Sequence, residues 1–194
     1  LTEDPTVSVA LLEAGGEGTA KEIHVPAAYG RLIQSQYDWN LWSEPEPGLM
    51  DRCLPLTRGL MLGGCGSLNA LVYIRGNRND YDRHAEGGAH GWSYNEVLPY
   101  FLRSEDNERG KDDYHGVGGP LTVSDGRSRH PLSDAFLLAC QQAGHLENPD
   151  FNAASQEGVG RYQLTQRNGR RCSTAVAFLA PARERPNLEV FTDA

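Results

Sequence analysis

The chain lacks any apolar run long enough to cross a membrane. Its 194 residues are 39% hydrophobic, and no stretch approaches the roughly 20 apolar residues of a transmembrane helix. The chain also lacks a surplus of basic residues, because 18 Lys and Arg stand against 26 Asp and Glu, a net charge of −8. Nucleic acids are bound through clustered Lys and Arg, so this balance argues against a nucleic-acid partner.

Cysteine is scarce, and its spacing excludes two kinds of site. The four cysteines lie far apart without a CxxC pair: Cys53, Cys65, Cys140 and Cys172. This pattern predicts reduced thiols, and neither a disulfide framework nor a metal site. No signal-peptide pattern opens the chain, so we expect a cytoplasmic location, with peripheral attachment to a membrane left open. The opening LTEDP is typical of the last turn of a helix stopped by Pro5, so we expect a piece of a longer protein.

Strand and helix patterns alternate along the chain. VSVALL (7–12) predicts a buried parallel strand, and residues 187–193 a second strand near the end. Residues 17–57 are rich in Pro and Gly, and such a long stretch without regular structure is often functional, as a lid or as a loop that covers a cofactor. CSTAVAFLAPARE (172–184) predicts a helix.

The middle of the chain predicts two helices and two strands. WSYNEVLPYFLRS (92–104) has Ser93 as a helix N-cap and Glu96 completing a capping box. HPLSDAFLLACQQAG (130–144) places apolar residues on one helical face and ends at Gly144. Residues 119–125 predict a strand, and residues 159–166 alternate as in a half-buried antiparallel strand.

The most informative segment is RGLMLGGCGSLNALVYIRG (58–76), where Gly63 and Gly64 interrupt an apolar run. Glycines in such a place allow backbone N–H groups to approach a ligand. The segment predicts a short helix from Ser67 to Ile74, whose free N–H groups would form an anion site. The alternative is an ordinary strand-to-helix turn.

An acidic residue, Glu13, directly follows the first predicted strand. In dinucleotide-binding folds, an acid at the end of the second strand accepts hydrogen bonds from ribose hydroxyls. The glycine motif of that fold belongs roughly 20 residues earlier, before Leu1. A solvated carboxylate at a strand end is the alternative reading of Glu13.

Together, EAGG (13–16) and RGLMLGGCGSLNALVYIRGNRNDYD (58–82) resemble the glucose–methanol–choline (GMC) oxidoreductases, flavoenzymes that oxidise alcohols. The resemblance extends over essentially the whole chain, through DWNLWSEPEPGL, GWSYNEVLPYFLRSEDNERG and NGRRCSTAVAFLAPARERPNLEVFTDA. The chain is most similar in appearance to bacterial choline dehydrogenases and FAD-dependent alcohol dehydrogenases.

The resemblance implies an α/β fold with an α+β insertion. A Rossmann-like FAD-binding domain, without its first βα unit, would occupy residues 1–85 and 169–194. Part of a substrate-cap domain, residues 86–168, would interrupt it.

The resemblance also implies a cofactor site. Glu13 would bind the adenosine ribose, and the stretch from Gly63 to Val72 the pyrophosphate and the flavin. The implied cofactor-binding residues are Glu13, Ala14, Gly63, Gly64, Cys65, Asn69, Ala70, Leu71 and Val72. Some members link FAD covalently through a histidine where this chain has Leu68, so we expect non-covalent FAD.

The chain departs from the family in two respects. Family members usually have a basic residue where this chain has Leu60 and a Trp where it has His84. They frequently have Ser where this chain has Cys65. The family's catalytic histidine belongs to a segment expected beyond residue 194. The chain has six histidines, and none of them lies in that context: His24, His84, His90, His115, His130 and His145. We therefore expect the 194 residues alone to be inactive.

The function implied is FAD-dependent oxidation of a small alcohol to an aldehyde, with hydride transfer to the flavin. Electrons would then pass to a quinone, oxygen or another carrier. A flavin-containing lyase similar to the hydroxynitrile lyases, and a non-catalytic FAD-binding fragment, are the alternatives. An oligomer is left open.

Overall fold

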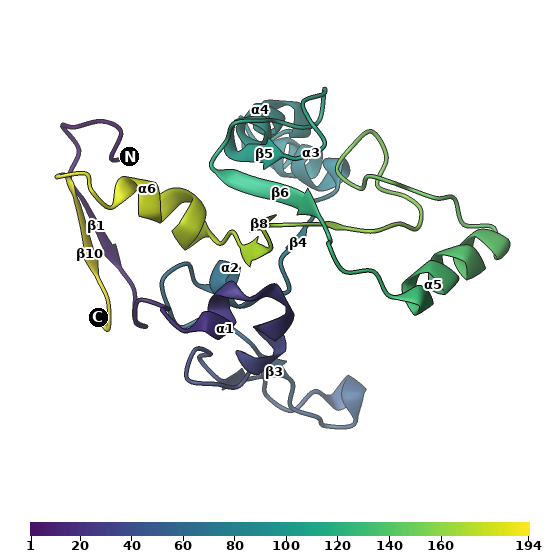
Figure 1. The fold of residues 1–194 in the computed structure, drawn as a ribbon, viewed down its shortest axis with the longest axis horizontal. Coiled ribbons are helices and arrows are strands. Elements are labelled where there is room, and N and C mark those ends of the chain that lie inside the picture. Colours follow the sequence, from purple (N-terminus) through teal and green to yellow (C-terminus); the bar gives the residue numbers. More distant parts are fainter. The chain divides into compact units, whose positions relative to one another are not determined.

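The computed structural model describes residues 1–194, and these form two compact units (Figure 1). The first unit combines Leu1–Leu71 with Asn168–Ala194, and the second is Val72–Arg167. The second unit begins at residue 72, whereas the sequence boundary was placed before residue 86. Helices and strands alternate in both units, as in an α/β protein.

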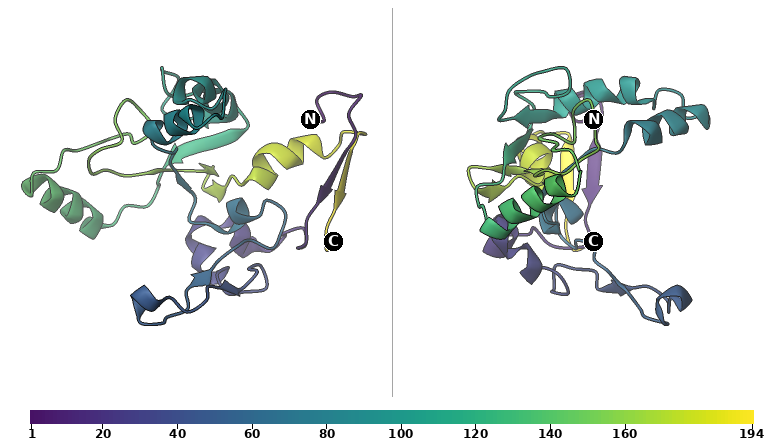
Figure 2. Two further views of the ribbon diagram at one scale, coloured as in Figure 1. Left: turned by 180° about the vertical axis from the view of Figure 1, so that it is seen from behind. Right: turned by 90° about the vertical axis from the view of Figure 1, so that its right-hand side faces the viewer.

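The first unit contains a parallel pair of strands from opposite ends of the chain. β1 (Val9–Leu12) pairs with β10 (Leu188–Phe191), with Val9 opposite Leu188 and Leu12 opposite Phe191. Figures 1 and 2 show the purple and yellow strands side by side. The predicted parallel strand is confirmed, but its predicted burial is wrong: Leu12 is 72% exposed. Half-buried and exposed residues alternate along β1, so one face of the strand pair is uncovered.

Short elements fill the region that was expected to lack regular structure, so that prediction is wrong. β2 and β3 form an antiparallel pair. The buried carboxylate of Asp38 organises the preceding turn, because it accepts the backbone N–H groups of Gln34, Asn40 and Arg58. The elements are α1 (Lys21–His24), η1 (Pro26–Arg31), β2 (Leu41–Trp42), η2 (Pro47–Leu49) and β3 (Pro55–Leu56).

A small apolar core joins α1 to the glycine-rich segment. Ile23, Leu32, Met61 and Leu68 form one buried cluster. Leu68 belongs to α2 (Cys65–Leu68). The hydrophobic effect favours burial of this side chain, so its packing in the core holds the glycine segment in place.

The predicted helix near the end of the chain is confirmed in its central part. A π-helical turn, η3 (Ala175–Leu179), continues into α6 (Ala180–Ala182). The short strand β9 (Arg170–Arg171) precedes it. This segment positions Thr174 and Ala175 against the glycine turn, since Thr174 Oγ1 donates to the carbonyl oxygen of Gly63 at 3.2 Å.

The second unit is built on a four-stranded sheet in the order β4-β7-β6-β5. β6 runs parallel to β5 and antiparallel to β7, and β7 is antiparallel to β4. The two predicted strands are confirmed in shorter form as β6 and β7. The strands of this sheet are β4 (Val72–Tyr73), β5 (Glu105–Asn107), β6 (Leu121–Asp125) and β7 (Gln163–Leu164). A fifth short strand of the unit, β8 (Gln166–Arg167), lies outside the sheet.

Three helices complete the second unit: α3 (Arg78–Glu86), α4 (Tyr94–Ser104) and α5 (Pro131–Gln142). The predicted capping box of α4 is confirmed, with Glu96 Oε2 accepting the Ser93 N–H at 3.1 Å. Figure 2 shows α5 projecting away from α3 and α4. Its apolar face is largely uncovered, since Leu132 is 71% and Phe136 63% exposed. No helix of the structure is long and apolar enough to span a bilayer.

Candidate cofactor site

A cavity of about 480 Å³ in the first unit brings together three of the predicted cofactor residues, Glu13, Gly63 and Gly64. The end of β1 and the glycine turn line it, together with residues 174–182 of the helical segment. Apolar side chains such as Leu11 and Phe178 form much of its wall. Its volume falls within the range typical of small-molecule sites, which combine apolar walls with a few polar groups.

The two glycines of the turn are required for different reasons. Gly64 has φ 49° and ψ −131°, a conformation that side chains disfavour, and a Cβ at this position would meet no heavy atom within 4 Å. Gly63 has φ 88°, and a Cβ there would lie 2.4 Å from Ser67 Oγ. Gly63 therefore serves internal packing, whereas the backbone of Gly64 faces open space that a ligand atom could enter.

The helix after this turn differs from the prediction. α2 spans only Cys65–Leu68, so the predicted helix from Ser67 to Ile74 is wrong. Asn69 Oδ1 accepts the N–H of Leu71 at 2.9 Å, and Leu71 adopts φ 65°, which takes the backbone out of the helix. Ser67 lies inside α2 with its hydroxyl on the Leu62 carbonyl at 2.8 Å, so no helix N-terminus exists there to bind an anion.

Glu13 extends from the end of β1. Its N–H donates to the Phe191 carbonyl at 2.9 Å, which continues the strand pairing by one residue. Its carboxylate is half-buried, and Oε1 accepts the N–H of Gly15 at 2.8 Å. Oε2 has no partner within the chain, so one carboxylate oxygen remains available for a hydroxyl donor. Gly15 is fixed by packing, because a Cβ there would lie 2.1 Å from the Leu60 carbonyl oxygen.

The remaining predicted residues are not gathered at the cavity. Ala14, Cys65, Asn69 and Ala70 are exposed, whereas Leu71 is buried at a positive φ, a strained state for a bulky residue. Val72 opens β4 in the second unit.

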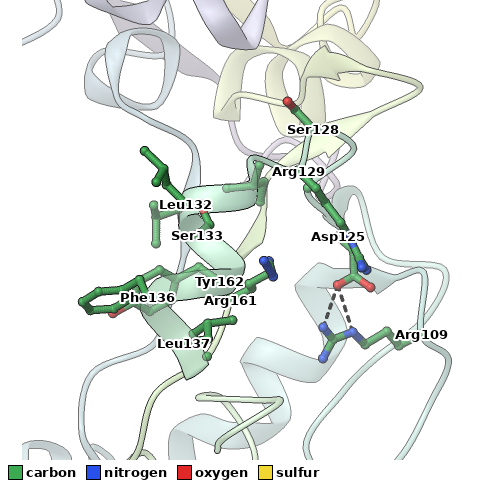
Figure 3. A pocket seen from close by; sticks show the side chains of 14 residues that line it. Arg109, Asp125, Ser128, Arg129, Leu132, Ser133, Phe136, Leu137, Arg161 and Tyr162 are labelled. Carbon is green, nitrogen blue, oxygen red and sulfur yellow. Dashed lines mark hydrogen bonds and ion pairs between the residues drawn. The ribbon is translucent and has the colours of Figure 1, made fainter. Parts of the chain in front are cut away.

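Val72 lines a different cavity, of about 600 Å³, within the second unit. Figure 3 shows Leu132, Phe136 and Leu137 of α5 on one side of it. On the other side, the Arg109 guanidinium is hydrogen-bonded to the Asp125 carboxylate, with Nη2 2.7 Å from Oδ1. Two further arginines line this cavity, Arg161, which is paired with Asp134, and Arg129.

Arg171 is the residue near the glycine segment that sequence reasoning missed. Its side chain is 2% exposed, and its Nη1 donates to Asn69 Oδ1 at 3.1 Å and to the Gly66 carbonyl at 3.2 Å. The doublet Arg170-Arg171 carries no signal that distinguishes the buried arginine from its exposed neighbour.

His115 is the histidine whose environment is most strongly perturbed. It is buried between two carboxylates, with Nε2 2.8 Å from Asp150 Oδ2 and Nδ1 3.1 Å from Glu105 Oε1. The hydrogen bonds to Asp150 and then to Glu105 raise the pKa of His115 to about 9. Both ring nitrogens are engaged, so His115 is built as a structural cation. His84 is exposed on α3.

The sequence model of the family described as GMC oxidoreductase matches residues 9–194. The chain belongs to the GMC oxidoreductase family. Mouse mitochondrial choline dehydrogenase is 46% identical to this GMC chain over 196 residues, covering 97% of the chain and 33% of that protein. The oxygen-dependent choline dehydrogenase of Sinorhizobium medicae is 43% identical over 191 residues, covering 98% of the chain and 35% of that protein. The family resemblance predicted from the motifs is thereby confirmed.

Solved structures agree with this assignment. Pyridoxine 4-oxidase from Mesorbium loti superposes with a TM-score of 0.93 and 36% identity over 100% of the GMC chain and 38% of that protein. An FAD-dependent oxidoreductase from Chaetomium thermophilum superposes with a TM-score of 0.89 and 29% sequence identity. That match covers 98% of this chain and 35% of the neighbour. The chain spans about a third of the length of the curated relatives it matches.

Proposed function

We propose that this chain forms part of an FAD site in an enzyme that oxidises a small alcohol to an aldehyde. The observation that carries the proposal is the joint placement of Glu13, Gly63 and Gly64 around one cavity. An acid at a strand end is the group that binds a ribose in dinucleotide folds, and a glycine turn allows the backbone to approach a phosphate closely. The family and the name of one solved neighbour, an FAD-dependent oxidoreductase, support the same cofactor.

The residues of the first unit fit FAD in identifiable ways. The free Oε2 of Glu13 would accept a ribose hydroxyl, while Oε1 stays on Gly15. The Gly64 backbone would allow close approach of a phosphate oxygen, because no Cβ occupies the open space in front of it. Exposed Asn69 would donate its amide to the cofactor. When bound, FAD supplies the acceptor for the substrate hydride, and the protein supplies binding and orientation.

We propose that the FAD is held without a covalent bond. Leu68 occupies the position at which some family members carry a linking histidine, and its side chain packs in the apolar core with Ile23 and Met61. A hydrocarbon side chain offers no nucleophile for attachment. The other predicted cofactor residues, Ala14, Cys65, Ala70, Leu71 and Val72, would contribute packing and backbone groups.

The substrate class follows from the relatives. Two proteins that match over nearly the whole chain are named choline dehydrogenases, so we propose choline or a similar small primary alcohol as substrate. The second unit would form part of the substrate cap, and a quinone, oxygen or another carrier would take the electrons.

Flavin absorbance of the purified full-length protein tests the proposal. We expect a bound flavin whose visible absorbance bleaches on anaerobic addition of choline or of another primary alcohol. A flavin that stays oxidised while a cyanohydrin is cleaved would favour the lyase alternative. A folded protein that retains no flavin, even after incubation with FAD, would contradict the proposed cofactor.

A further inference from the structure

Arg171 is a buried cation without an acidic partner. Nε donates to the Ile23 carbonyl oxygen at 2.8 Å, and Nη1 donates to Gly66 and Asn69. All three acceptors are uncharged amide oxygens. Nη2 is buried and has no hydrogen-bond partner. Buried charges in proteins are normally paired, because an isolated one loses its hydration without compensation.

Burial lowers the pKa of Arg171 to about 10, and no nearby carboxylate opposes this effect. The guanidinium therefore remains charged at neutral pH. Its low exposure also means that dissolved salt screens this charge less than it screens a surface arginine. The charge of Arg171 therefore creates a positive electrostatic potential beside the segment that runs from Gly63 to Asn69.

The same guanidinium determines how the Asn69 amide is oriented. Asn69 Oδ1 accepts two hydrogen bonds, from Arg171 Nη1 at 3.1 Å and from the Leu71 N–H at 2.9 Å. A flipped amide would place its NH₂ group against these two donors, which is unfavourable. The Nδ2 group is thereby kept on the side of the residue turned away from Arg171, available as a donor.

We propose that Arg171 is a positioning residue of the cofactor site, one that fixes the Asn69 amide as a donor and supplies a positive charge that the anionic dinucleotide neutralises. This inference rests on the proposed FAD site and assigns to it a residue outside the glycine segment. Arg171 connects that segment with α1 through Ile23, so it also holds the donor at a constant place.

The affinity of the apoprotein for FAD tests this role, measured by the quenching of flavin fluorescence during titration. Arg171→Gln removes the positive charge and most of the N–H donors of the guanidinium. We expect the Kd for FAD to rise about tenfold or more, the usual range for the loss of a hydrogen bond to a charged group. Arg171→Lys keeps the charge with fewer donors and should give an intermediate Kd. Arg170→Gln is the matched control, since it removes an exposed charge from the adjacent position, and its Kd should stay within about twofold of wild type.

A double-mutant cycle with Asn69→Ala separates positioning from general destabilisation. If Arg171 acts through Asn69, the Kd of Asn69→Ala/Arg171→Gln will rise less than the product of the two single effects. Multiplicative effects, or an Arg171→Gln Kd equal to that of wild type, would overturn the inference. If Arg171→Gln does not fold, Arg171→Lys decides, because an unchanged Kd in that variant would also overturn it. Absence of FAD binding by the wild-type protein would instead contradict the proposed function.

Discussion

The Nε2 atom of His115 lies 2.8 Å from Oδ2 of Asp150 inside the second unit. On its other side the imidazole faces Glu105, which also accepts from Arg75 Nη2 at 3.0 Å and from the Gly116 N–H at 2.9 Å. Two cations and two carboxylates thus balance within a buried cluster. This balance ties β5 to two loops of the unit and removes the cost that each charge would carry alone.

The pH dependence of stability should report this cluster. The folded-state pKa of His115 is raised to about 9 from an unfolded value near 6.5. Protonated His115 therefore stabilises the folded state fully below about pH 6.5, and this contribution is lost as the pH rises through 9. The loss lowers the free energy of unfolding by roughly 3 kcal/mol. We expect the thermal midpoint of the wild-type protein, measured by calorimetry, to fall over this range. His115→Gln should lack that slope, whereas the exposed control His145→Gln should keep it; equal slopes in all three proteins would refute the assignment.

Neutralising the central carboxylate should destabilise the protein strongly. Glu105→Gln leaves Arg75 and His115 as buried cations with too few anions, and removal of one member of a buried ion pair costs about 3–5 kcal/mol. Asp134→Asn is the control, because it breaks an exposed ion pair with Arg161 and should cost under about 1 kcal/mol. Urea unfolding of the two variants measures the difference, and similar losses would mean that the cluster contributes no more than a surface contact.

The mode of flavin attachment has a simple chemical test. Because Leu68 is packed in the apolar core and offers no nucleophile, acid precipitation of the holoprotein should release all flavin into the supernatant. Spectra of pellet and supernatant measure the partition. Yellow colour that persists in a washed pellet would reveal a covalent link to another residue.

Substitution of Gly64 in the glycine turn should prevent the protein from incorporating flavin. Gly64→Val forces a β-branched residue into φ 49° and fills the open space beside the turn, so we expect flavin incorporation to be lost. Gly48→Ala is the control, since Gly48 has an ordinary φ and no atom within 4 Å of a Cβ. The flavin-to-protein ratio after reconstitution is the measurement. A folded Gly64→Val protein with full flavin would reduce the turn to a structural role.

Local signals in the sequence predicted some of the regular elements, whereas α3, β5 and the short elements of residues 17–57 were not predicted. The capping box at Ser93 and Glu96 specifies the start of α4, and the β-branched run before Glu13 specifies β1, because both depend on neighbouring residues. The sequence could not predict where α2 ends. There, the Asn69 side chain captures the Leu71 N–H and overrides an apolar pattern that favours a longer helix.

Long-range features of the site were not predictable from spacing. Glu13 and the glycine turn could be proposed because they lie in recognisable motifs. Arg171 could not, since its role depends on contacts with Gly66 and Ile23, which lie 105 and 148 residues away along the chain. The buried Gln163 likewise interrupts the expected alternation, because it pairs with Asn107 inside a polar core and not with solvent.

Glu13→Gln probes the proposed contact between the Glu13 carboxylate and the ribose of FAD. The glutamine retains an oxygen for the Gly15 N–H, so the turn should stay intact, but it replaces the second acceptor with a donor. Glu189→Gln on β10 is the matched control, because it removes the same charge from an exposed position on the neighbouring strand.

The measurement is the Kd for FAD of the three apoproteins. We predict a Kd about tenfold or more above wild type for Glu13→Gln, from the loss of a charge-assisted hydrogen bond, and an unchanged Kd for Glu189→Gln. A folded Glu13→Gln protein that binds FAD as tightly as wild type would contradict the account.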